Sequence, residues 1–163
     1  LAPGRHLMEP MVTGRLIQAA AVKATDMALV VGAATGYAAA LLAKLANTVV
    51  ALEANAALAQ RAGTTFAELG IDNAAVVEGA LAAGCAKHAP YDVIFLDGAI
   101  EQLPQALIDQ LGEGGRMVGV VIEGGVGRAM LWLKSGGVLS KRILFDANVT
   151  PLPGFGIPAR FVL

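Results

Sequence analysis

The order of apolar and polar residues along the chain follows two alternating patterns. Short, continuous apolar runs rich in β-branched side chains are typical of strands covered on both faces of a sheet. Between them lie segments in which apolar residues recur at helical spacing, as expected for helices that pack on such a sheet. The strands predicted in this way are 28–31, 48–53, 74–78, 91–96 and 116–122, and the helices are 11–22, 37–46, 56–69 and 104–111.

The C-terminal part of the chain shows a different arrangement. Segments 128–134 and 138–145 both have the pattern of strands, and the Ser-Gly-Gly sequence at 135–137 between them predicts a β-hairpin. Strands that alternate with helices pair in parallel and carry helices on both faces of the sheet. The expected fold is therefore α/β: a three-layer sandwich with a mostly parallel, Rossmann-like sheet and an antiparallel C-terminal hairpin at its edge. The tail 151–158, with three prolines and two glycines, is expected to form an irregular arm.

Composition supports a single domain over residues 1–163. Hydrophobic residues make up 56% of the chain and charged residues 15%, a balance that excludes intrinsic disorder. The net charge of −1 and the lack of a Lys/Arg run give no indication of nucleic-acid binding. One cysteine, Cys85, and two distant histidines exclude a disulfide scaffold and a structural zinc site. The composition leaves the oligomeric state open and places the protein in the cytoplasm by default.

Two features of the N-terminal half bear on targeting. The chain begins with Leu1 and lacks a basic start followed by an apolar run, so we expect a fragment or a processed chain rather than a signal peptide. The longest charge-free run is 27–43, and its Gly32 and Gly36 satisfy a packing pattern of membrane helices. Because the run is shorter than a membrane span, a buried strand, a tight turn and a helix explain it better, and no membrane association is expected.

Candidate chemistry is concentrated where the first two predicted strands end. Ligands of open α/β sheets bind outside the carboxyl ends of the strands. Gly32 and Gly36 flank the turn after the first strand, where glycine lets the backbone approach a ligand and the next helix offers free N–H groups. Glu53 ends the second strand, and a carboxylate about 20 residues after the glycine turn accepts hydrogen bonds from ribose hydroxyls. These features predict a nucleoside site, against the alternative of a tight turn followed by a solvated glutamate.

The spacing within the glycine turn discriminates between nucleoside cofactors. The sequence G-A-A-T-G at 32–36 lacks the middle glycine of the dinucleotide pattern G-x-G-x-x-G, and its last glycine comes one position early. This spacing disfavours NAD. Gly32-x-x-x-Gly36 instead resembles the first motif of class I S-adenosylmethionine-dependent methyltransferases.

The rest of the chain resembles one family, the protein-L-isoaspartate O-methyltransferases. No single motif is decisive, and the resemblance rests on the order of several stretches that together cover nearly the whole chain. They are E-P-M-V (9–12), G-Y-A-A-A-L-L-A (36–43), V-V-A-L-E (49–53), A-P-Y-D-V-I (89–94), L-P-Q-A-L (103–107), L-G-E-G-G-R-M-V (111–118) and V-T-P-L-P-G (149–154). The N-terminal helical segment of the family has no counterpart here, which agrees with the expected fragment.

The resemblance implies S-adenosylmethionine as the cofactor and an isoaspartyl-containing protein or peptide as the methyl acceptor, in a repair reaction that esterifies a carboxylate. It assigns no catalytic residue and no metal. The cofactor-binding residues that it implies are Gly32, Ala34, Gly36 and Tyr37 on the methionine side, Glu53 at the ribose, and Ala80 and Leu81 at the adenine edge.

Four positions depart from the family pattern. Val30 replaces a usual acidic residue, Ala34 the middle glycine of the first motif, and Ala80 the aspartate that reaches the adenine. Met8 replaces a serine or threonine, and a methionine cannot donate or accept hydrogen bonds as a hydroxyl does. These departures support a second hypothesis, a catalytically silent relative that acts as a binding module. A third hypothesis is a small-molecule O-methyltransferase.

Three further positions have both a functional and a structural interpretation. Asp97 follows a strand where metal-dependent O-methyltransferases place a cation ligand, but no second carboxylate is clearly spaced to share a metal, which favours a hydrogen-bonding aspartate. Cys85 precedes His88 by three residues, and a plain cysteine is favoured over a nucleophile pair. His6, beside Arg5, is a candidate contact for an anionic substrate, against a solvated histidine.

Overall fold

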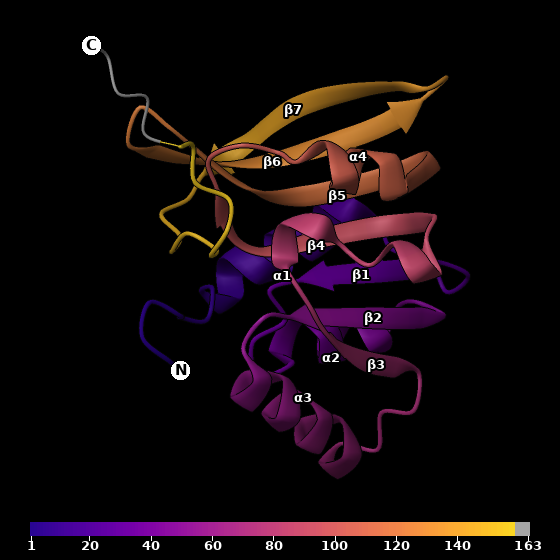
Figure 1. Cartoon of the computed structure of the whole chain (residues 1–163). Coiled ribbons are helices and arrows are strands. Elements are labelled where there is room, and N and C mark those ends of the chain that lie inside the picture. Colours follow the sequence, from indigo (N-terminus) through magenta and orange to yellow (C-terminus); the bar gives the residue numbers. More distant parts are fainter. Residues whose placement is uncertain (159–163) are drawn as a thin grey trace.

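A computed structural model describes residues 1–158 of the chain, and within them one seven-stranded sheet forms the centre of the molecule (Figure 1). The strand order is β3-β2-β1-β4-β5-β6-β7. The strands are β1 (Met27–Val31), β2 (Thr48–Glu53), β3 (Ala74–Glu78), β4 (Tyr91–Ile100), β5 (Leu111–Glu123), β6 (Val126–Ser135) and β7 (Val138–Asp146). The helices are α1 (Pro10–Ala20), α2 (Tyr37–Ala43), α3 (Ala56–Glu68) and α4 (Gln105–Gln110), with short 3₁₀ turns η1 (Leu81–Ala83) and η2 (Ala86–His88).

The pairing of the strands confirms the predicted fold class. Strands β3, β2, β1, β4 and β5 pair in parallel, whereas β6 and β7 are antiparallel to their neighbours and form the expected hairpin at one edge. The order reverses direction between β1 and β4, because the chain first moves outward through β2 and β3 and then returns. This reversal creates the crevice in which open α/β sheets bind ligands.

Two apolar cores fill the space on the two faces of the sheet. One contains side chains from α1, α2 and α3, such as Leu16, Leu42 and Phe66, packed on the sheet. The other contains side chains from η1, α4 and the C-terminal arm, such as Leu81, Leu107 and Leu152. Helical or looped layers therefore cover both faces, which explains why the parallel strands are apolar without alternation.

Several predicted boundaries are wrong, and tertiary contacts account for the differences. Helix α1 ends at Ala20 rather than at 22, where Ala21 turns left-handed (φ 46°) and Arg116 Nε donates to the carbonyl of Ala20 at 2.9 Å. Helix α2 ends at Ala43 rather than at 46, and the side chain of Asn73 donates to the Ala43 carbonyl at 2.7 Å. Capping groups from distant segments thus end both helices early.

The two strands at the centre of the molecule are longer than predicted. Strand β4 continues through Ile100 instead of ending at 96, because Ala99 and Ile100 pair with β5 after a register shift. The arm adds two hydrogen bonds at this end: the Ala99 N–H donates to the Thr150 carbonyl at 3.0 Å, and the Leu152 N–H donates to the Ala99 carbonyl at 2.7 Å. Strand β5 begins at Leu111 rather than at 116, immediately after α4. The predicted irregular arm is therefore tied to the end of β4.

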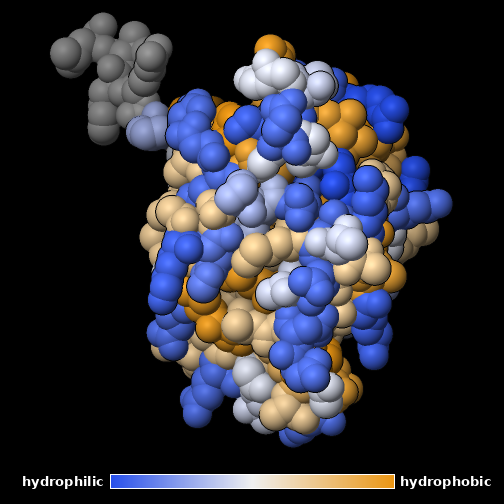
Figure 2. All heavy atoms as spheres, turned by 90° about the vertical axis from the view of Figure 1, so that its right-hand side faces the viewer, coloured by the Kyte–Doolittle hydropathy of each residue, from blue (hydrophilic) through white to orange (hydrophobic). Residues whose placement is uncertain are grey.

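The N-terminal segment and the C-terminal arm meet at the carboxyl ends of the parallel strands, on the left of Figure 1. His6 Nδ1 lies 3.4 Å from Thr150 Oγ1 across this meeting point. Figure 2 shows the opposite side of the molecule, at the amino ends of the parallel strands. Hydrophilic side chains are interspersed with apolar ones there. Among residues 1–158, no helix has the length and apolar character needed to cross a membrane.

Candidate functional site

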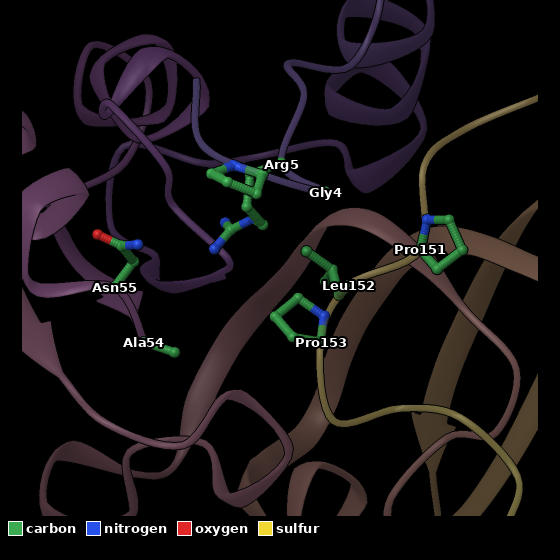
Figure 3. Close-up of a pocket in the computed structure, with 8 residues that line it drawn as sticks. Gly4, Arg5, Ala54, Asn55, Pro151, Leu152 and Pro153 are labelled. Atoms are coloured by element: carbon green, nitrogen blue, oxygen red, sulfur yellow. The ribbon is translucent and has the colours of Figure 1, made fainter.

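A cavity of about 500 Å³ lies at the carboxyl ends of the strands, a size within the range of small-molecule sites (Figure 3). Three segments that are far apart in the sequence enclose it: the N-terminal segment, the turn after β2, and the C-terminal arm. Its lining residues are Pro3, Gly4, Arg5, Ala54, Asn55, Pro151, Leu152 and Pro153.

The glycine turn after β1 lies beside this cavity and is tightly constrained. The N–H groups of Gly32 and Ala33 both donate to the Leu52 carbonyl, at 2.9 and 3.0 Å. Gly32 has a φ of +81°, and a Cβ at this position would lie 2.6 Å from Leu152 Cδ2. Gly36 has a φ of +90°, and a Cβ there would lie 2.8 Å from Phe66 Cε1. Both glycines are therefore required by conformation and by close contact.

Ala34 adopts a conformation that glycine would adopt with less strain. Its φ is +50°, one of two positive values among the non-glycine residues of the described chain. The N–H of the same residue donates to Glu53 at 2.7 Å. The departure from the family's glycine thus leaves the shape of the turn intact and stores backbone strain there.

Glu53 is fully buried at the end of β2, and internal donors saturate its carboxylate. Arg5 donates to both oxygens, at 2.6 Å from Nη1 and 2.8 Å from Nη2. The backbone N–H groups of Ala34 and Asn55 add bonds of 2.7 and 2.9 Å. Burial alone would raise the pKa of Glu53, but the hydrogen bonds from Arg5, Asn55 and Ala34 and the charge of Arg5 together lower it.

Arg5 belongs to the candidate site, although no sequence pattern singles it out. In the sequence it stands only as the neighbour of His6, yet its side chain is 9% exposed and forms a bidentate ion pair with Glu53, 48 residues away. In Figure 3 it reaches from the N-terminal segment into the space between Asn55 and Leu152. The only available signal was the rule that a buried carboxylate requires a partner, and this rule does not say which cation supplies it.

Asp97, on β4, is buried near the Arg5–Glu53 ion pair. Burial raises its pKa to about 7, against the opposing charge of Arg5, and the charge of Glu53 raises it further. No hydrogen bond to its carboxyl forms within residues 1–158, so the favoured hydrogen-bonding interpretation is not what is seen in this part of the chain. In the same residues, no three metal-ligating side chains converge on one point.

None of the predicted cofactor residues is in the lining of the cavity, which Glu53 adjoins through its neighbour Ala54 and its partner Arg5. Tyr37 begins α2 with 40% of its surface exposed, next to the glycine turn. Ala80 is exposed, whereas Leu81 is buried in the second apolar core. The roles of these residues at the methionine and adenine ends stay predictions.

The other candidates from the sequence occupy structural positions. Cys85 is buried, its N–H donates to Gln110 and its carbonyl accepts from the Tyr91 hydroxyl at 2.6 Å. His88 is exposed in η2. Met8 is 5% exposed in the first apolar core, so this side chain packs where a hydroxyl was expected to face the site.

Comparison with known proteins identifies the family to which these features correspond. Residues 4–152 match the family model of protein-L-isoaspartate(D-aspartate) O-methyltransferases. A protein-L-isoaspartate O-methyltransferase of Koribacter versatilis is 38% identical over 151 residues, which are 93% of this chain and 68% of that protein. One from Azorhizobium caulinodans is 33% identical over 153 residues, which are 93% of this chain and 70% of that protein.

Solved structures show the same fold. A protein-L-isoaspartate O-methyltransferase superposes with a TM-score of 0.83 and 24% identity, over 90% of this chain and 48% of the other. A putative enzyme of this kind from Plasmodium falciparum, in complex with S-adenosyl-L-homocysteine, superposes with a TM-score of 0.72 and 23% identity, over 87% of this chain and 71% of the other.

Proposed function

This chain belongs to the protein-L-isoaspartate(D-aspartate) O-methyltransferase family of S-adenosylmethionine-dependent methyltransferases, and we propose that its cavity binds S-adenosylmethionine through Glu53. The single observation that carries this proposal is the buried Glu53 carboxylate, held at the end of β2 beside the glycine turn of β1. That position corresponds to the ribose site of nucleoside-binding α/β folds.

The hydrogen-bonding capacity of Glu53 tests whether the site fits a nucleoside. A carboxylate has about four acceptor positions, and Arg5, Ala34 and Asn55 fill them with four donors. With Arg5 in place, no position is left for a ribose. When Arg5 leaves, two positions open, and two hydroxyl donors of a ribose match them. The residues therefore fit the nucleoside once Arg5 has moved.

The other predicted residues would hold the two ends of the cofactor. The turn Gly32–Gly36, with its close backbone approach at Gly32 and strained Ala34, would contact the methionine end, together with Tyr37. Ala80 and Leu81 would flank the adenine through the backbone and apolar contact.

We propose an isoaspartyl residue of a damaged protein or peptide as the methyl acceptor. When bound, the cofactor supplies an electrophilic methyl group, and the chain has to orient the acceptor carboxylate and exclude water from it. Leu152, 5% exposed and packed over Gly32 and Gly98, would exclude water at this point. Because Met8 offers no hydroxyl, catalysis would rest on positioning rather than on a hydrogen bond from that residue.

A catalytically silent binding module is the second candidate function. The observation that favours it is the internal saturation of Glu53 together with the burial of Met8. In such a protein the Arg5–Glu53 pair would be a permanent structural element, and the family fold would serve another purpose.

Calorimetric titration with S-adenosylhomocysteine tests the proposed function. We expect the protein to bind this ligand, and Glu53→Gln to weaken binding at least about tenfold, since a lost charge-assisted hydrogen bond is worth about 1.5–3 kcal/mol. Glu68→Gln, which changes an exposed carboxylate on α3, is the matched control and should bind as the wild type does.

Transfer of a methyl group identifies the acceptor. Isoaspartyl peptides should be methylated and the same peptides with ordinary aspartate should not. Transfer only to small carboxylic acids or phenols would favour the small-molecule O-methyltransferase. A folded protein that binds no S-adenosylhomocysteine would contradict the proposal and favour the silent module.

A further inference from the structure

We propose that the N-terminal segment 1–8 is an autoinhibitory strap, in which Arg5 occupies the nucleoside site by taking the acceptor positions of Glu53 that the ribose requires. This inference rests on the proposed function of Glu53 as the ribose ligand. Cofactor binding then requires that Arg5 leave the site, so the strap sets the affinity of the cavity.

The first argument is the geometry of the ion pair. The guanidinium meets Glu53 with two parallel bonds of 2.6 and 2.8 Å, and Nη2 also lies 3.5 Å from the Gly32 carbonyl. Arg5 therefore bridges the ends of β1 and β2, the two strand ends between which a nucleoside would bind. The same residue also lines the adjoining cavity.

The second argument is that Arg5 is the donor that a ribose would have to replace at Glu53. The donors from Ala34 and Asn55 come from the backbone of the turns after β1 and β2 and stay with the fold. Within residues 1–158, Arg5 is the one donor to Glu53 that belongs to a side chain on a separate segment. It is therefore the group that a ribose has to replace.

The third argument is that few contacts hold the strap closed. Its C-terminal end is anchored by Met8 in the core, while Pro3, Gly4, His6 and Leu7 are exposed. A turn closed by the Arg5 N–H on the Ala2 carbonyl, at 2.9 Å, carries the arginine. His6 lies 3.4 Å from Thr150, at an exposed position where water competes for the contact. Release of Arg5 would thus disturb the strap and leave the sheet intact.

The strength of the Arg5–Glu53 pair relative to ribose hydrogen bonds determines whether Arg5 raises or lowers the affinity for the cofactor. A bidentate, charge-assisted pair is stronger than hydrogen bonds from neutral hydroxyls. A ribose restores the two hydrogen bonds to Glu53 but does not replace the positive charge of Arg5. The need to displace Arg5 therefore lowers the affinity of the protein for the cofactor. Removal of the guanidinium should then raise the affinity for the cofactor.

Titration of S-adenosylhomocysteine into Arg5 variants tests the strap. We expect Arg5→Ala to bind at least about tenfold more tightly than the wild type, which corresponds to about 1.4 kcal/mol. Arg5→Lys keeps the charge without the bidentate geometry and should lie between the two. Arg61→Ala, an exposed arginine on α3, is the control and should match the wild type.

Hydrogen exchange of the wild-type protein provides a test that depends on no variant. Saturation with S-adenosylhomocysteine should speed exchange of the Arg5 N–H and of its neighbours in segment 1–8, because the strap opens. Equal or weaker binding by Arg5→Ala, or slower exchange of the strap on saturation, would overturn the inference while leaving the nucleoside site in place. If wild type, Arg5→Ala and Arg5→Lys are all folded and none binds, both the strap and the proposed function are wrong.

Discussion

At the scale of single residues, three side chains and one strained backbone position define the site. Glu53 is buried with its charge intact because four donors converge on it, and one of these donors depends on the left-handed conformation of Ala34. The strained residue is therefore also one whose backbone N–H contacts the carboxylate. Glycine would provide the same geometry without the cost of a Cβ.

We predict that Ala34→Gly stabilises the protein. Relief of the positive φ should exceed the effect of the entropy that glycine adds to the unfolded chain and leave a gain of about 0.5–1 kcal/mol in the free energy of unfolding. Chemical denaturation of the variant measures this gain. Ala33→Gly is the matched control in the same turn. Ala33 is similarly buried but has no positive φ, so the substitution relieves no strain and should destabilise by about 1 kcal/mol. Stabilisation by both substitutions would contradict the assignment of strain to Ala34.

At the scale of elements, the position of the site depends on how helices pack at the ends of strands. The start of α2 is set by Gly36, where a Cβ would lie 2.8 Å from Phe66 and 3.3 Å from the Ala62 Cβ, both on α3. This contact brings the first turn of α2 against α3 and fixes the glycine turn beside Glu53. Helix α3 itself begins at Asn55, whose side chain caps it by accepting from the Leu58 N–H.

Two glycine-to-alanine substitutions should have opposite effects on stability. Gly36→Ala should lower the free energy of unfolding by about 2–4 kcal/mol, because it adds a left-handed alanine and forces Phe66 to move. Gly63→Ala, within α3 and open to solvent, should raise it by about 0.5–1 kcal/mol through helix propensity. Thermal unfolding of both variants checks this, and a neutral Gly36→Ala would show that α2 does not depend on close contact with α3.

At the scale of the whole molecule, the fold brings three charged groups from three distant segments into one buried cluster. Arg5 comes from the strap, Glu53 from β2 and Asp97 from β4, and Asp97 is 7% exposed. Within residues 1–158, the guanidinium of Arg5 acts on both carboxyl groups, and it pairs with Glu53. Asp97 is left with the cost of burial, which raises its pKa to about 7.

The raised pKa of Asp97 predicts that the protein becomes less stable as the pH rises toward and above neutrality. The folded state holds the Asp97 proton up to a pKa of about 7, whereas the unfolded chain loses it near its ordinary pKa of about 3.9. The stability that this proton contributes is therefore present at low pH and is lost as the pH rises through the folded-state pKa. From about pH 5 to about pH 8, the free energy of unfolding should fall by about 2 kcal/mol through this group.

Glu53 does not mask this effect, because its pKa is lowered and its contribution is lost only as the pH falls below its ordinary range. Denaturation of Asp97→Asn at several pH values measures the contribution of Asp97. The variant should lose most of the slope between about pH 5 and about pH 8, whereas the exposed Asp109→Asn should keep it. An unchanged slope in Asp97→Asn would show that Asp97 is ionised throughout this range in the folded protein.

Local sequence patterns are sufficient to predict the order of the elements and the end of the sheet at which a ligand would bind. Strands 48–53 and 74–78 agree with β2 and β3 at both ends, and the hairpin and the parallel sheet were predicted from local patterns. Such patterns are reliable because each strand or helix must bury its own apolar face, and this requirement is written within a few neighbouring residues. Gly32 and Glu53 could be placed at one edge for the same reason, since parallel strands end on the same side.

The contacts of Glu53, in contrast, follow from the arrangement of distant segments in the fold. The strap has no periodic pattern, so nothing local indicates that Arg5 turns back onto a carboxylate 48 residues away. The same holds for the extension of β4, which depends on pairing with β5 after a register shift and on contacts with the arm, and for the pKa of Asp97, which depends chiefly on burial. Local burial patterns specify elements, but an ion pair or a shifted pKa depends on which distant segments the complete fold brings together.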